Sequence, residues 1–284
     1  MTAARYHAPH RGCSRADDWP QETRQRNLRR EMRWNVGPFG AKDLFTIVNL
    51  LGGVFAFHYV AIGQPTLAGY ALLAGYLLGD TLDGPVARLT KTSNKFGSEF
   101  DTATDHLVQG IAPALIVYAV YARAGQTVTG IVLMAVLITC ATVRQALFSV
   151  AKMGDPLMYT GLPRTVSGYA AMAYVLSSFF FGKNPIGYTL GGFIIPALAF
   201  LNLLPIPYMT HRGGRRMQTP VKILVIGFLV TPVAALLFAR QYTFDVLFVW
   251  TFGYAGLAWI PIYPHEKKAF FRRYREWTTE VSAK

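Results

Sequence analysis

Two short segments of this 284-residue chain indicate its fold and its chemistry most directly: Asp80-Thr-Leu-Asp83-Gly84-Pro-Val-Ala87-Arg88 and, eight residues later, Gly97-Ser-Glu-Phe-Asp101-Thr-Ala-Thr-Asp105. Both lie in or beside long apolar runs, so their four aspartates fall where membrane-spanning helices are expected. An aspartate at the centre of such a helix costs roughly 2.5–3.5 kcal/mol on insertion scales. A cluster of four therefore needs a compensating partner.

The spacing of the aspartates indicates what that partner is. Asp80 and Asp83 are three residues apart, and Asp101 and Asp105 are four apart, so each pair lies on one face of its helix. A helical hairpin with its loop near Thr92 would bring both pairs to a similar depth, facing each other. Carboxylates in a low-dielectric site cannot all stay ionised without cations. We therefore predict a two-metal site for Mg²⁺ or Mn²⁺, which suits displacement at phosphorus.

The composition places the chain in a membrane. Hydrophobic residues make up 52% of it and charged residues only 15%, whereas soluble domains carry about 25% charged residues. The apolar residues form blocks near the roughly 20-residue length that crosses a bilayer. We predict an all-α polytopic protein with about eight transmembrane helices, at 44–63, 66–89, 100–121, 127–150, 165–181, 187–208, 221–238 and 244–262.

The net charge of +13 is distributed as in a membrane protein with one basic side. With the N-terminus inside, 24 of the 28 Lys and Arg residues fall in inner segments and three in outer loops. Both termini are therefore expected in the cytoplasm, with the protein in the cell (inner) membrane. The basic residues abut apolar runs and form no contiguous soluble stripe, which argues against nucleic acid as a partner.

This charge distribution also divides the chain. We expect a cytoplasmic N-terminal tail and interfacial helix at 1–42, a transmembrane domain at 43–264 and a basic cytoplasmic tail at 265–284. Residues 24–42 and 265–284 mix basic and aromatic residues, as amphipathic helices at a membrane surface do. Ordinary basic flanks of the spans would show the same composition.

The two quoted segments resemble the signature of the CDP-alcohol phosphotransferases, with all eight fixed positions at the family's spacing. The resemblance implies a six-helix core, extended here by two helices, and a homodimer. It implies an enzyme that transfers a phosphatidyl group from CDP-diacylglycerol, or an ether-lipid analogue, to the hydroxyl of a small alcohol, releasing CMP. It also implies that Asp80, Asp83, Asp101 and Asp105 hold the metals, and that Asp105 is the base that deprotonates the acceptor.

Further residues receive roles from the same resemblance. The expected contacts of the CDP moiety are Thr46, Asn49, Gly84, Ala87, Arg88 and Gly97. Lys95, Arg144 and Arg164 are predicted to contact the acceptor or a phosphate from their charge and position and not from the resemblance. Lys95 lies in the loop between the aspartate pairs, Arg164 lies at the cytoplasmic mouth, and Arg144 is a lone arginine inside a span, which is expensive without an anionic partner. Arg144 would equally suit a buried pair with an aspartate, and Arg164 an ordinary basic flank.

Serine is the acceptor that the local resemblance favours. Gly110-Ile-Ala-Pro113-Ala114, Glu99 and Gly161-Leu-Pro163 are similar to fragments of the membrane-integral phosphatidylserine synthases. Two fragments depart from that pattern. Arg144-Gln-Ala-Leu147-Phe-Ser149 stands where the synthases usually carry Arg-Leu-Ala-Arg-Phe-Asn, and Arg164-Thr-Val-Ser stands where they carry Ser/Thr-Pro-Ala-Ala. Choline, inositol phosphate and glycerol phosphate therefore stay open as acceptors.

A cation transporter is the alternative from a different functional class. Intramembrane carboxylates and eight spans suit it equally well. It does not explain why Gly84, Ala87, Arg88 and Gly97 occupy the family's positions between the aspartates. We therefore favour the enzyme.

Overall fold

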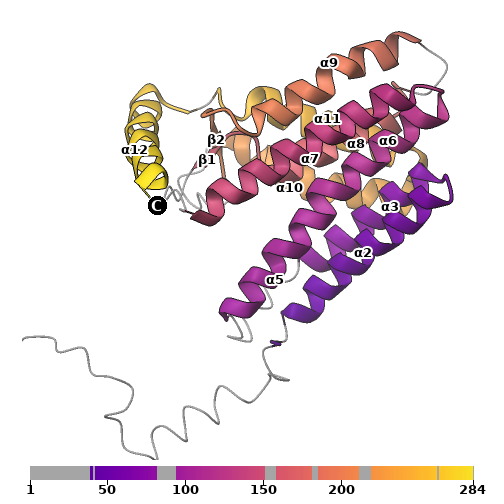
Figure 1. Ribbon diagram of the computed structural model, residues 1–284, viewed down its shortest axis with the longest axis horizontal. Coiled ribbons are helices and arrows are strands. Elements are labelled where there is room, and N and C mark those ends of the chain that lie inside the picture. Colours follow the sequence, from indigo (N-terminus) through magenta and orange to yellow (C-terminus); the bar gives the residue numbers. More distant parts are fainter. Residues whose placement is uncertain are drawn as a thin grey trace, which may run out of the picture.

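The computed structural model describes residues 39–40, 42–81, 94–150, 158–180, 185–210, 219–260 and 262–283. These ranges are mostly helical, as the predicted all-α class requires. Figure 1 shows most helices running side by side as a bundle, with α12 set across one end. The elements in chain order are α2 (Asp43–Ala61), α3 (Pro65–Gly75), the π-helix η3 (Tyr76–Asp80), α5 (Lys95–Asp105), the π-helix η4 (His106–Ile111), α6 (Ala112–Arg123), α7 (Thr127–Val150), β1 (Met158–Thr160), α8 (Arg164–Leu176), α9 (Pro185–Leu201), β2 (Pro207–Met209), α10 (Thr219–Phe238), the 3-10 helix η6 (Arg240–Tyr242), α11 (Thr243–Leu257) and α12 (Pro264–Ala283).

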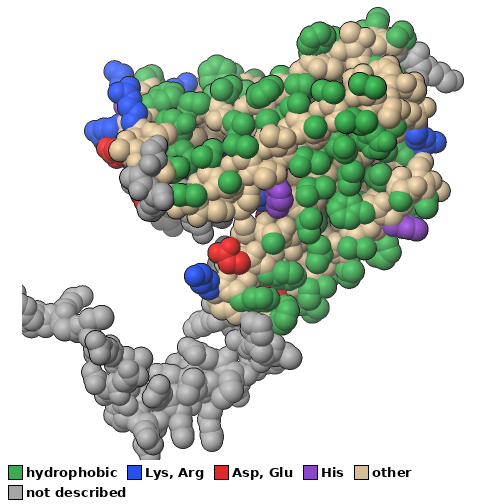
Figure 2. All heavy atoms as spheres, in the orientation of Figure 1, with side chains coloured by type: hydrophobic (Ala, Val, Ile, Leu, Met, Phe, Trp, Pro, Cys, Tyr) green, Lys and Arg blue, Asp and Glu red, His purple; other side chains and the backbone are tan. Residues whose placement is uncertain are grey.

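Within the described ranges, three helices are long and apolar enough to cross a membrane: Asp43–Ala61, Lys95–Arg123 and Thr127–Val150. The second is a rod of 29 residues that joins α5, η4 and α6. Large apolar side chains point outward from other helices too; Phe193 of α9 is 73% exposed and Phe238 of α10 is 87% exposed. Figure 2 shows apolar side chains spread over much of the visible face. Such a surface is unfavourable in water and suits lipid tails, so it is typical of a membrane protein.

Glycines bring α2 and the α3–η3 helix together backbone to backbone. A Cβ on Gly52 would lie 2.7 Å from the Cα of Gly75, and one on Gly79 would lie 2.6 Å from the backbone N of Asn49. Small residues at such contacts allow membrane helices to approach closely. The contact therefore fixes the backbone of η3, which ends at Asp80, against α2.

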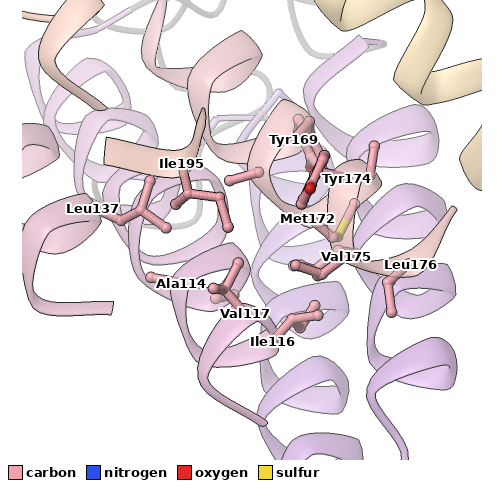
Figure 3. Close-up of a cluster of buried hydrophobic side chains, with 14 of the residues drawn as sticks. Ala114, Ile116, Val117, Leu137, Tyr169, Met172, Tyr174, Val175, Leu176 and Ile195 are labelled. Atoms are coloured by element: carbon pink, nitrogen blue, oxygen red, sulfur yellow. The ribbon is translucent and has the colours of Figure 1, made fainter. Parts of the chain in front are cut away.

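Helix α8 lies inside the bundle, and every residue from Ser167 to Leu176 is buried. Met172 and its neighbours belong to the main apolar cluster, which includes Ile116 of α6 and Ile195 of α9. Figure 3 shows these side chains converging from the three helices. Protein interiors are close-packed, so the first turn of α8 is held in place by its neighbours.

The last seven residues of the sixth predicted span are wrong. We predicted a helix over 187–208, but α9 ends at Leu201 and the chain enters β2. This strand pairs antiparallel with β1, with Met158 opposite Met209 and Thr160 opposite Pro207. Pro205 and Pro207 lack the backbone N–H that a continuing helix would need, which explains the break.

Several other boundaries move by a few residues. α5 begins at Lys95, before the predicted start of the third span at 100, while α8 and α11 end at Leu176 and Leu257, before the predicted ends at 181 and 262. The spans predicted at 44–63 and 127–150 match α2 and α7 closely. The C-terminal tail forms α12, whereas the helix predicted at 24–42 lies almost entirely outside the described residues.

Candidate active site

Three of the four predicted metal ligands lie together. Asp80 ends η3, and Asp101 and Asp105 lie on α5; one carboxylate oxygen from each lies within 4.8 Å of the other two. The two helices therefore bring these aspartates together, as the hairpin geometry predicted. Asp83 and the connecting loop near Thr92 lie outside the described residues.

Both helices of the site change to π-helical geometry next to an aspartate. η3 ends on Asp80, and η4 begins directly after Asp105. A π-turn accommodates one extra residue and is frequent at functional sites. Its effect here is to shift the register of each helix at the carboxylate. Neither turn is predictable from the sequence, since the hydropathy pattern carries no signal for a π-turn.

The described carboxylates fit a divalent cation. All three are oxygen donors, which Mg²⁺ and Mn²⁺ prefer, and all three are only partly exposed. Oδ1 of Asp101 is buried and has no hydrogen-bond partner among the described residues. A buried carboxylate oxygen without a donor is costly, and a bound cation would remove that cost.

Both oxygens of Asp105 have partners. Its Oδ1 accepts a hydrogen bond of 2.7 Å from Nε2 of Gln109, one helical turn later. Its Oδ2 lies 3.5 Å from the guanidinium of Arg164, at the start of α8. Gln109 in turn accepts a hydrogen bond from the hydroxyl of Thr165, and Arg164 donates to Oε1 of Gln145 on α7. Asp105 is thus held between its own helix and α8.

The three basic residues predicted to contact the acceptor lie in different surroundings. Arg164 faces the acidic cluster. Arg144 donates from one nitrogen to the backbone oxygens of Thr160 and Asn202, at 2.6 and 2.5 Å, and lies over the ring of Phe148. Its hydrogen bonds within the described ranges therefore go to carbonyls, and among those residues Arg144 forms no pair with an aspartate. Lys95 is exposed at the first residue of α5.

Three of the six predicted nucleotide contacts lie in the described part of the chain, and all three are buried. Thr46 and Asn49 are buried on α2, and within the described part of the chain their side-chain polar atoms have no hydrogen-bond partner. Gly97 packs against the start of α2, where an added Cβ would meet the carboxylate of Asp43 and lie 2.8 Å from Cε of Lys42. Gly84, Ala87 and Arg88 lie outside the described residues.

Sequence reasoning missed several polar residues at or near this site. Asp43 is fully buried, accepts a hydrogen bond of 2.7 Å from the backbone N of Gly40 and lies 3.4 Å from Nζ of Lys42. Its place at the edge of an apolar run was a usable signal. Gln109 and Tyr169, both buried, gave none, because a single amide or phenol in an apolar run is usually structural.

Comparison with known proteins gives a consistent result. A family model described as CDP-alcohol phosphatidyltransferase matches residues 41–203, from the start of α2 to the turn after α9. The match therefore includes Asp80, Asp101 and Asp105 and the whole of α8.

Three relatives illustrate the similarity. The chain is 29% identical over 220 residues to a CDP-diacylglycerol–serine O-phosphatidyltransferase of Helicobacter pylori, covering 74% of this chain and 90% of the relative. It is 29% identical over 163 residues to a protein of the same name from Saccharomyces cerevisiae, covering 51% of this chain and 58% of the relative. It is 27% identical over 168 residues to an archaetidylserine synthase of Methanothermobacter thermautotrophicus, covering 58% and 68%.

Proposed function

The chain belongs to the CDP-alcohol phosphatidyltransferase family, and we propose that it transfers a phosphatidyl group from CDP-diacylglycerol to L-serine, releasing CMP. The observation that carries the proposal is the cluster of Asp80, Asp101 and Asp105, with Asp105 held beside a guanidinium. An ether-lipid analogue of the donor suits the same chemistry, since one relative is named for archaetidylserine.

Serine is proposed because all three relatives described above carry it in their names. The departures from the synthase pattern lie at the end of α7 and the start of α8, and the structure brings two of these residues, Gln145 and Arg164, into contact beside Asp105. Choline, inositol phosphate and glycerol phosphate are therefore the acceptors to test against serine.

Two divalent cations, Mg²⁺ or Mn²⁺, would be held by Asp80, Asp101 and Asp105 together with Asp83. When bound, they would supply positive charge that stabilises the phosphate oxygens during displacement. Thr46 and Asn49 offer buried polar atoms to the nucleotide from α2, and Asn49 packs against Gly79 of η3. Gly84, Ala87, Arg88 and Gly97 are proposed as its other contacts.

Asp105 acts as the general base in this proposal. It takes the proton of the acceptor hydroxyl, whose oxygen forms a bond to the β-phosphorus of the donor. The bond from that phosphorus to the CMP oxygen breaks, and CMP leaves with the electron pair. Arg164 places a positive charge at the same carboxylate, where an anionic group of the acceptor would bind.

The membrane arrangement is part of the proposal. We propose about eight transmembrane helices in a domain at 43–264, flanked by cytoplasmic segments at 1–42 and 265–284. Both termini and the active site would face the cytoplasm at the inner membrane, as the Lys and Arg distribution predicts. A homodimer is proposed from the family alone.

Purified protein in lipid vesicles tests the reaction. With CDP-diacylglycerol, labelled serine and Mn²⁺, we expect CMP and labelled lipid in equal amounts, and neither product after the divalent cations are chelated with EDTA. Parallel reactions with choline, inositol phosphate and glycerol phosphate identify the acceptor. Failure to release CMP with any of the four acceptors would contradict the proposed chemistry, while release with another acceptor would contradict only serine.

A further inference from the structure

A hydrogen-bonded bridge joins Asp105 to helix α8. Gln109 is 2% exposed, yet both ends of its amide are used: Nε2 donates to Oδ1 of Asp105 at 2.7 Å, and Oε1 accepts from the hydroxyl of Thr165. A buried amide normally costs free energy unless its hydrogen bonds are satisfied. Here the partner of the amide nitrogen is the side chain assigned to proton transfer.

The Asp105 carboxylate fixes which end of the amide faces it. An ionised carboxylate only accepts hydrogen bonds, so Nε2 faces Asp105, and Oε1 is left to accept from the hydroxyl of Thr165, which anchors the far end of the amide to α8. The backbone of Gln109 is held from the same side. A Cβ on Gly168, one turn after Thr165, would collide with the carbonyl oxygen of Gln109, so α8 lies directly on this residue.

We propose that Gln109 and Thr165 are positioning residues that hold the Asp105 carboxylate in the orientation needed for proton transfer. The inference rests on the proposed function, in which Asp105 is the base. Gln109 donates to Oδ1, and the guanidinium of Arg164 lies 3.5 Å from Oδ2. When the acceptor draws Arg164 toward its own anionic group, Oδ2 becomes the oxygen that receives the proton, while Oδ1 stays held.

A neutral amide suits this role. It donates to an ionised carboxylate without adding charge to a site that already holds three aspartates. Hydrogen bonds to a charged acceptor are about twice as strong as neutral ones, so one amide restricts rotation of the carboxylate effectively. Residues that orient ligands and bases in this way typically change activity by about 10–100-fold when they are removed.

The test uses a pair of matched substitutions in the full-length protein. Thr165→Val keeps the size of the side chain and removes the hydroxyl, whereas Thr165→Ser keeps the hydroxyl. Gln109→Met removes both hydrogen bonds of the amide at similar volume. Ser167→Ala is the control, because Ser167 is a buried hydroxyl on the same helix that donates to the backbone oxygen of Leu198 and not to the bridge.

For each variant we would measure kcat, KM for the CDP-lipid and the thermal midpoint in detergent. We expect kcat to fall about 10–100-fold in Thr165→Val and Gln109→Met, with KM for the donor within about twofold of wild type. Thr165→Ser should recover most of the lost kcat. A purely structural role would lower the thermal midpoint and the yield of folded protein, and it would not lower kcat selectively while KM for the donor stays unchanged.

Three results would overturn the inference: wild-type kcat in Thr165→Val, a Thr165→Ser as slow as Thr165→Val, or an equal loss in Ser167→Ala. If Gln109→Met does not fold, the two Thr165 variants decide alone. Wild-type protein that releases no CMP would instead overturn the proposed function, and this inference with it.

Discussion

The end of α7 and the start of α8 each carry a largely buried arginine, and the two are used differently. Arg144 donates to the backbone oxygens of Thr160 and Asn202, which joins α7 to β1 and to the turn after α9. Arg164 pairs with Asp105 and Gln145, inside the acidic site. Burying a charge is costly in both regions, but only Arg164 has a carboxylate as partner among the described residues.

The largest effect on activity is expected from substitution of Asp105, the carboxylate that pairs with Arg164. Asp105→Asn keeps the hydrogen bond from Gln109 but removes the base, and CMP release should fall about 1000-fold. The measurement is CMP release by the purified variant. Asp245→Asn is the matched control, since this carboxylate binds Ser178 far from the cluster in the sequence and should retain near-normal activity. Near-normal activity of Asp105→Asn would remove Asp105 from the proposed mechanism.

Arg164→Gln should affect activity rather than stability. It loses the positive charge beside Asp105, and we expect kcat/KM for the acceptor to fall about 10–100-fold. The thermal midpoint should change little, because glutamine retains a donor for Gln145. Measuring kcat/KM for serine beside an uncharged acceptor separates an anion contact from a general loss. Equal losses for both would argue that Arg164 serves Asp105 alone.

Arg144→Leu should show the reverse pattern. Two charge-assisted hydrogen bonds disappear and two carbonyls lose their donor, which should destabilise the fold by about 3 kcal/mol. Thermal unfolding monitored by helical circular dichroism would measure the loss. The folded fraction should keep nearly normal kcat. A stable variant with a raised KM for the acceptor would instead support the anion contact predicted from the sequence.

The smallest effect on activity is expected from substitution of Gln145, which connects the end of α7 to the start of α8. Gln145 lies one residue after Arg144 and accepts a hydrogen bond from Arg164. Gln145→Leu removes the acceptor of one charge-assisted hydrogen bond but leaves the pair between Arg164 and Asp105, so kcat/KM should fall only about fivefold, roughly 1 kcal/mol. Steady-state kinetics with the preferred acceptor would detect it. A loss as large as that of Arg164→Gln would show that Gln145 positions the guanidinium.

The helices and the acidic cluster follow from the sequence because their signals are local. Long apolar runs predict α2 and α7 within a few residues, and spacings of three and four residues place each aspartate pair on one helical face. The meeting of Asp80 with Asp101 and Asp105 adds only the assumption of a hairpin. These predictions need only the helical period of 3.6 residues and the free-energy cost of placing aspartates in a membrane.

The remaining features depend on contacts between distant segments. The pairing of β1 with β2 replaces the end of a predicted span, although Pro205 and Pro207 already marked a break. The role of Gln109 depends on Thr165, which is distant in the sequence and adjacent only in the fold. Likewise, the residues around Arg144 and Arg164 in the sequence do not indicate that Arg144 contacts carbonyls and that Arg164 contacts a carboxylate.

The length and burial of α8 have a consequence for the enzyme in different membranes. With 13 residues the helix is about 20 Å long, shorter than the roughly 30 Å of a bilayer core. A helix exposed to lipid at this length would suffer hydrophobic mismatch and would tilt or shift with bilayer thickness. Because α8 is surrounded by protein, its neighbours set its depth, and the groups that it presents to Asp105 are insulated from changes in lipid chain length.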